Sequence, residues 1–189
     1  MDATTEYAMA YALTTTAGVR AFLALLVAAV AAHQGWIHLT NSFAWLGSTG
    51  SIVVLAIFAL LEILGDKIPV VDHVLHLIHF VARPAAAAIL VAGLVHTPSN
   101  AELVSLMVVG ALNAFVVHGS IATVRAASTA TTLGAVNPGL SAVEDVVAVG
   151  GGVAAIAFPI VAAVIALVFV IALVLVVRRV TTVGRPSYR

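Results

Sequence analysis

Residues 143–177 read VEDVVAVGGGVAAIAFPIVAAVIALVFVIALVLVV, a stretch whose only charged residues are Glu144 and Asp145. As one helix it would rise about 52 Å, whereas the hydrocarbon core of a bilayer is about 30 Å thick. The stretch must therefore break, and residues 150–152 (three glycines) or 158–159 (Phe-Pro) are the expected places. This stretch predicts two membrane-crossing helices.

The composition extends that prediction to the whole chain. Hydrophobic residues make up 62% of the 189 positions, charged residues make up 8%, and the mean hydropathy is +1.18. Soluble domains carry about 25% charged residues, so this chain is expected to have a lipid bilayer as its partner. Runs of Ala, Leu and Val favour helices over a barrel, which predicts an all-α, polytopic transmembrane bundle in one domain, 1–189. The zero net charge gives no indication of a nucleic-acid partner, and cysteine is absent.

Six crossings with broken helices fit the apolar runs. Loops 33–50 and 96–101 contain no Lys or Arg, while Lys67, Arg125 and the tail do. With the positive charges inside, both termini are expected to be cytoplasmic, with 179–189 as a short basic tail. The alternative has five crossings, with residues 141–152 as an interfacial or re-entrant segment. The expected runs are 21–32 (extended backward to residue 7), 51–64, 70–95 interrupted at residues 83–84, 103–117, and two within 143–177.

The two halves of the chain resemble each other weakly. Each half has a proline-bearing loop, then acidic residues, then a proline within a hydrophobic run. This pattern suggests half-repeats at 7–98 and 102–178, a 3+3 inverted repeat of the kind found in secondary transporters. Chance recurrence of such features in a helical bundle is the alternative.

The stretch 62–73 contains three candidate binding acids, Glu62, Asp66 and Asp72. Glu62 and Asp66 are four residues apart and share one helix face. Carboxylates beside a membrane helix are costly unless they meet water, a cation or one another. A solvated loop with a Lys67 ion pair is the alternative for Asp66, whereas Glu62 is expected to be buried with a partner.

Three histidines follow at helical spacing: His73, His76 and His79. With Asp72 they offer ligands for a divalent metal cofactor or groups for a proton relay. The alternative is an amphipathic helix at the headgroups whose histidines face water. No HExxH-type motif is present, so metal binding stays one hypothesis of three.

Further charged candidates are Arg20, Arg125, Glu144 and Asp145. Residues 141–144 match an S-x-x-E capping box, which explains Glu144 structurally but leaves Asp145 as a candidate for cation or proton contact. Arg20 either marks a helix end or lies within the membrane, where Glu62, Asp66 or Asp145 would have to neutralise it.

At these residues the sequence resembles a family of uncharacterised bacterial membrane proteins, domain of unknown function 4126. The resemblance implies a multi-pass protein of the bacterial inner membrane and no established activity. Its most distinctive element is Asp-Lys-Ile-Pro at 66–69. Further matching segments are 18–21, 62–73, 83–84, 118–119, 125–129 and 137–145.

The favoured function is a small transporter or channel-like protein for a cation, a proton-coupled solute or a lipid headgroup. The acids would coordinate or relay, and Arg20 and Arg125 would act as counter-charges. An intramembrane enzyme acting on lipids through the His/Asp cluster is the second hypothesis, but no complete catalytic constellation is recognisable. A structural subunit of a membrane complex is the third, and a homo-oligomer is compatible with each.

Overall fold

The computed structural model describes residues 1–65, 69–97 and 99–183, with the side chains of 69–77 and 183 left undescribed. Every regular element in these residues is helical, which confirms the all-α prediction. In chain order the elements are α1 (Ala3–Val19), α2 (Ala21–His33), the 3-10 helix η1 (Asn41–Gly47), α3 (Thr49–Gly65), α4 (Pro69–Leu94), α5 (Asn100–Thr132), α6 (Asn137–Ala157) and α7 (Pro159–Val183).

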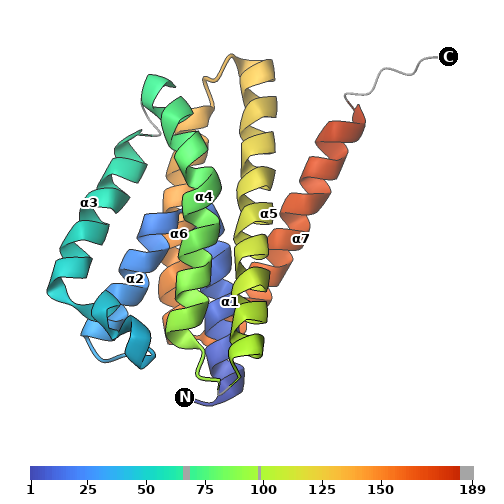
Figure 1. Cartoon of the computed structure of the whole chain (residues 1–189). Coiled ribbons are helices and arrows are strands. Elements are labelled where there is room, and N and C mark those ends of the chain that lie inside the picture. The colour runs from blue at the N-terminus through green and yellow to red at the C-terminus, as the bar shows by residue number, and fades with distance from the viewer. Residues whose placement is uncertain (66–68, 98, 184–189) are drawn as a thin grey trace.

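Helices α1 and α2 form a hairpin that turns back inside the bundle (Figure 1). Near the start of α1, the Glu6 carboxylate accepts a hydrogen bond from the backbone N–H of His96, just beyond α4, at 3.0 Å. After α2, Thr40 donates its backbone N–H to the Gly93 carbonyl near the end of α4, at 2.8 Å. Both outer ends of the hairpin therefore lie beside one end of α4, so the expected first run, 7–32, forms two helices and not one continuous helix.

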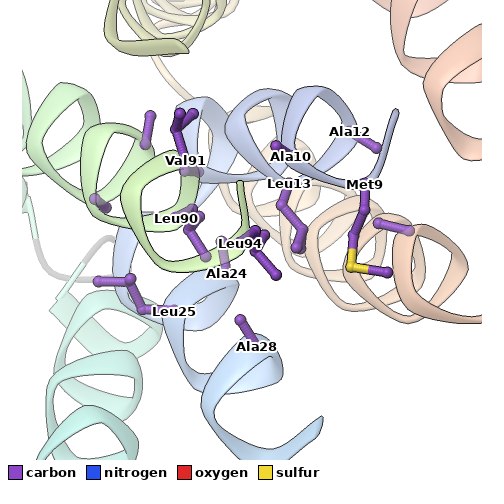
Figure 2. Close-up of a cluster of buried hydrophobic side chains, with 14 of the residues drawn as sticks. Met9, Ala10, Ala12, Leu13, Ala24, Leu25, Ala28, Leu90, Val91 and Leu94 are labelled. Atoms are coloured by element: carbon purple, nitrogen blue, oxygen red, sulfur yellow. The ribbon is translucent and has the colours of Figure 1, made fainter. Parts of the chain in front are cut away.

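The core of the bundle is where this hairpin packs against α4. Figure 2 shows Leu13 of α1 facing Ala24 of α2 and Leu90 and Leu94 of α4, and all four side chains are at most 1% exposed. Alanine and glycine at these interfaces let the helix backbones approach closely, as in other membrane bundles. Gly18 of α1 is the tightest such contact, since a Cβ there would lie 2.6 Å from the Cβ of Val117.

Helix α4 runs through Pro84 without the expected interruption. Proline removes one backbone hydrogen bond, which membrane helices tolerate where neighbouring groups compensate for the loss. Helix α5 likewise continues beyond the expected end at residue 117, through the small residues up to Thr132. The apolar runs identified both helices; the bounds of α4 agree with the expected run within one residue, whereas the length of α5 was underestimated.

The break within 143–177 falls at Phe158, between α6 and α7, where the backbone leaves helical geometry (φ −140°, ψ 65°). Pro159 then begins α7, because proline is well accommodated in the first turn of a helix. The glycines at 150–152 remain helical inside α6. Residues 141–152 also lie inside α6, which is long and apolar enough to cross a membrane, and the alternative of a re-entrant segment at this place stays untested.

Three helices of the described residues are long and apolar enough to cross a membrane: α5, α6 and α7. A fourth span results if η1 and α3, bent by 64°, are taken together. Helix α2 and the part of α4 from Ile78 to Leu94 are shorter apolar helices. The structure thus confirms a helical bundle suited to lipid, but it does not confirm six crossings.

The start of α1 and the end of α7 lie at opposite ends of the bundle (Figure 1). The expectation that both termini share one side assumed that the first apolar segment crosses completely. Because α1 and α2 return to the end of the bundle where α1 begins, the structure does not confirm that both termini share one side. The half-repeats 7–98 and 102–178 stay a hypothesis.

Candidate functional site

The helix break at Arg20 lies inside the bundle. Arg20 has extended backbone angles (φ −145°, ψ 107°) between the end of α1 and the start of α2, and its side chain is fully buried. A break of this kind leaves carbonyl groups of α1 and N–H groups of α2 without helical partners. In a lipid environment these groups need partners from within the protein.

Glu62, near the end of α3, supplies acceptors for the start of α2. Its Oε1 accepts from the N–H of Ala21 at 3.0 Å, and its Oε2 accepts from the N–H of Phe22 at 3.1 Å. A carboxylate is also favoured at the positive end of a helix dipole. Glu62 is 1% exposed, and the Nε2 of His79 lies 3.5 Å from its Oε1. The expectation of a buried, partnered Glu62 is met.

Arg83 of α4 supplies a donor for the end of α1. One terminal nitrogen of its guanidinium donates to the Gly18 carbonyl at 3.1 Å, and the same nitrogen lies 2.6 Å from Nδ1 of His118. A cation complements the negative end of a helix dipole. The two helix ends at the break are therefore matched by side chains of opposite charge from α3 and α4.

The Arg20 guanidinium reaches into the start of α6. Its NH2 nitrogen lies 2.9 Å from Oδ1 of Asp145 and 3.9 Å from Oε2 of Glu144, and it donates to the Ser141 hydroxyl at 3.0 Å. Its other terminal nitrogen donates to the Glu62 carbonyl at 3.5 Å. Arg20 thus connects the first half of the chain to the second through buried polar contacts.

A second arginine, Arg125 of α5, also binds Glu144. Its Nε and NH2 donate to the two carboxylate oxygens of Glu144, both at 2.8 Å, in the bidentate geometry that gives Arg–carboxylate pairs their strength. Glu144 consequently lies between two arginines. The capping-box prediction for Ser141 and Glu144 is wrong, because α6 begins four residues earlier, at Asn137, and both side chains bind arginines instead.

The charges within this cluster cancel formally. Three arginines are matched by three carboxylates, and the two histidines complete the set. Such balance is what allows ionised groups to remain away from water, since an isolated charge there is very costly. We call this set the break cluster: Arg20, Glu62, His79, Arg83, His118, Arg125, Glu144 and Asp145.

The candidate residues from the sequence divide into three groups. Arg20, Glu62, Arg125, Glu144 and Asp145 come together in the break cluster, and their role in binding stays a prediction. Asp66 lies outside the described residues, and the side chains of Asp72, His73 and His76 do as well. Among the described side chains, no group of three or more His, Asp or Glu residues could hold a metal. The metal hypothesis therefore stays untested at His73 and His76, while His79 faces Glu62.

Sequence reasoning missed Arg83 and His118 as members of the cluster. Arg83 was placed at a helix interruption, and His118 appeared only in a segment that resembles the family. The signal that could have identified both is an ionisable side chain at the centre of a long apolar helix, which usually faces the bundle interior.

Asn113, in the middle of α5, forms hydrogen bonds to a neighbouring helix. Its amide nitrogen donates to the Thr14 and Thr15 hydroxyls at 3.0 and 2.8 Å, which joins α5 to α1.

Comparison with known proteins adds a family and no activity. A family model described as "Domain of unknown function (DUF4126)" matches residues 7–179. No curated protein and no solved structure matches the chain. The match covers every residue of the break cluster.

Proposed function

The chain belongs to the family described as Domain of unknown function (DUF4126), and we propose that it is a small membrane transporter coupled to protons or another small cation. The break cluster is the coupling site in this proposal. The observation that carries it is the position of Arg20, fully buried at a helix break and 2.9 Å from Asp145. Discontinuous helices with charged groups at their ends are the feature that secondary transporters use to bind ions inside the membrane.

Glu144 supplies the switching element. It lies between Arg125, at 2.8 Å, and Arg20, at 3.9 Å, so a small displacement exchanges its partner. Protonation of Asp145 would remove the charge that Arg20 now faces, and Arg20 would then draw Glu144 away from Arg125. Charge interactions are strong in such a weakly polar interior, so one bound proton shifts the balance between the two arrangements.

In this proposal the α1–α2 hairpin is re-entrant and is the element that moves during transport. Glu62 and Arg83 hold its tip through the Ala21 N–H and the Gly18 carbonyl. A change in the charge of Glu62 would weaken the contact with α2 and allow the tip to shift relative to α3. Access to the cluster would thereby alternate between the two ends of the bundle.

The orientation in the membrane follows from the distribution of basic residues. Arg125 and Arg178 lie toward the end of the bundle where α5 and α7 finish, and Lys67 falls between α3 and α4 in the sequence. The opposite end, with the start of α1, has no Lys or Arg. By the positive-inside rule the basic end faces the cytoplasm, so the N-terminus lies on the other side. The topology proposed is five crossings, α3 to α7, plus the re-entrant hairpin.

Flux measurements in proteoliposomes test the function. The wild-type protein should dissipate an imposed pH gradient or cation gradient, and Glu62→Gln and Asp145→Asn should slow that dissipation. Glu102→Gln is the matched control, because Glu102 is a carboxylate at the far end of the bundle that bonds Tyr7 and Thr97. Gel filtration of each variant checks that it folds. Wild-type flux equal to that of empty liposomes across a panel of cations would overturn the proposal, as would unchanged flux in both variants.

A further inference from the structure

Two adjoining cavities follow the inner face of α7. One, of about 360 Å³, lies between α1, α6 and α7, and the other, of about 130 Å³, lies between α5, α6 and α7. Val19, Val147 and Phe169 line both, so the cavities form one groove, which we call the α7 groove. Helix α7 diverges from the other helices toward its C-terminal end (Figure 1).

The α7 groove is apolar and opens sideways. Val146 and Gly150 of α6 and Ile165 of α7 line it and are exposed, so its mouth faces the surroundings of the bundle. The threonine hydroxyls along its walls already have partners: the Thr15 hydroxyl donates to the Tyr11 carbonyl, and the Thr16 hydroxyl to the Ala12 carbonyl. Arg125 and Glu144 of the break cluster also line the smaller cavity, and they bind each other there. An occupant needs no hydrogen bonds here, and apolar cavities of this kind do not retain water.

The length of the groove fits one leaflet of a bilayer. Along α7 it extends from Ala162 to Leu173. Eleven residues of α-helix rise about 16 Å, close to half of the roughly 30 Å hydrocarbon core. The chain that matches this groove in chemistry and length is therefore a lipid acyl chain.

Basic residues lie beyond the end of the groove. Arg178 and Arg179 follow Leu173 by five and six residues on α7, and both are exposed. This places two guanidinium groups at the level of headgroups, about 8–9 Å further along the helix axis. Arginine binds phosphate oxygens well, and basic groups at this level attract anionic lipids.

We infer that the α7 groove binds an anionic phospholipid, with one acyl chain between α6 and α7 and the phosphate beside Arg178 and Arg179. The site rests on the groove and the basic end of α7, and it does not require transport, although Arg125 and Glu144 of the break cluster line the smaller cavity. The lipid supports α7, which has the smallest buried share of the three candidate spans, 11%.

Native mass spectrometry of the detergent-purified full chain, with synthetic phosphatidylglycerol and phosphatidylcholine added in turn, tests the inference. Wild type should retain one phosphatidylglycerol, and Gly150→Leu should lose it because the new side chain enters the groove. A Cβ at Gly150 meets nothing within 4 Å, so the variant should fold. Gly139→Leu is the matched control on the same helix, since a Cβ there also meets nothing and the residue does not line the groove.

The double variant Arg178→Gln, Arg179→Gln tests the headgroup contact separately. Each arginine should favour the anionic lipid by about fivefold, so the preference for phosphatidylglycerol should fall toward equality. Equal lipid retention by Gly150→Leu and wild type would overturn the acyl-chain site. An unchanged preference in the double variant would overturn the phosphate contact. Either result leaves the flux experiment unaffected, so the two proposals fail independently.

Discussion

Two side chains of opposite charge, Glu62 and Arg83, bind the two helix ends that meet at Arg20. The Glu62 carboxylate accepts the N–H groups of Ala21 and Phe22, and the Arg83 guanidinium donates to the Gly18 carbonyl. Each charge has the sign that its helix end favours. The break is therefore a stabilised feature of the fold, and its partners can be tested one at a time.

Replacing Glu62 should destabilise the protein in a graded manner. Glu62→Leu leaves two buried N–H groups without acceptors and should cost about 2–5 kcal/mol. Glu62→Gln keeps one amide acceptor and should cost less. Unfolding in mixed micelles with increasing SDS measures both, with Glu102→Gln as the control at the bundle end. Equal stability of wild type and Glu62→Leu would contradict the capping role.

Arg20 and Asp145 should be energetically coupled. Arg20→Gln and Asp145→Asn should each destabilise the protein, and the double variant should cost less than their sum by about 0.5–3 kcal/mol. The reason is that each single change leaves a charge without its partner, either the fully buried Arg20 or the partly buried Asp145. The same cycle with Arg178→Gln in place of Arg20→Gln is the control and should be additive. Additivity in both cycles would show that the 2.9 Å contact contributes nothing.

Gly18 should not tolerate a side chain. An added Cβ would lie 2.6 Å from the Val117 Cβ and 2.8 Å from the Ala114 carbonyl oxygen, so Gly18→Ala must push α1 away from α5. Overpacking of this kind costs about 1–3 kcal/mol, measured by the same SDS unfolding. Gly150→Ala introduces the same methyl group into open space and should be nearly neutral. Equal effects at the two positions would contradict the close approach of α1 and α5.

Single-cysteine labelling can test the topology, because the chain has no native cysteine. Ala3→Cys and Gln34→Cys, at the two outer ends of the hairpin, should react together with a membrane-impermeant maleimide added outside intact cells. Ala135→Cys, exposed between α5 and α6, should react only after the membrane is permeabilised. Labelling of Ala3→Cys and Gln34→Cys from different sides would show a complete first crossing and overturn the hairpin.

The sequence predicted the class of fold and most helix centres, since apolar composition and run length decide both. It could not predict the reversal at Arg20, because no proline marks it and Gly18, two residues earlier, lies within α1. The residues that stabilise the break, Glu62 and Arg83, are 40 or more positions away. Local signals such as the capping box at 141–144 were misleading here, since the same side chains serve distant arginines.

The break cluster was predictable in part for a related reason. Glu62 and Asp145 stood out as carboxylates in apolar surroundings, and lipid requires such groups to find partners. The pairing of carboxylates with arginines depends on how the helices pack. That packing depends in turn on small residues such as Gly18 and Ala114. Spacing along one helix carries no information about such contacts between helices.

The pairing of Arg20 with α6 also constrains the order in which the molecule assembles. Arg20 is synthesised before Ser141 and Asp145, which emerge only after five further helices have been made. Until then the tip of the hairpin carries a positive charge that has no counterpart from α6. Final docking of the α1–α2 hairpin is therefore a late step of biogenesis. Truncation before α6 should leave this hairpin outside its final position.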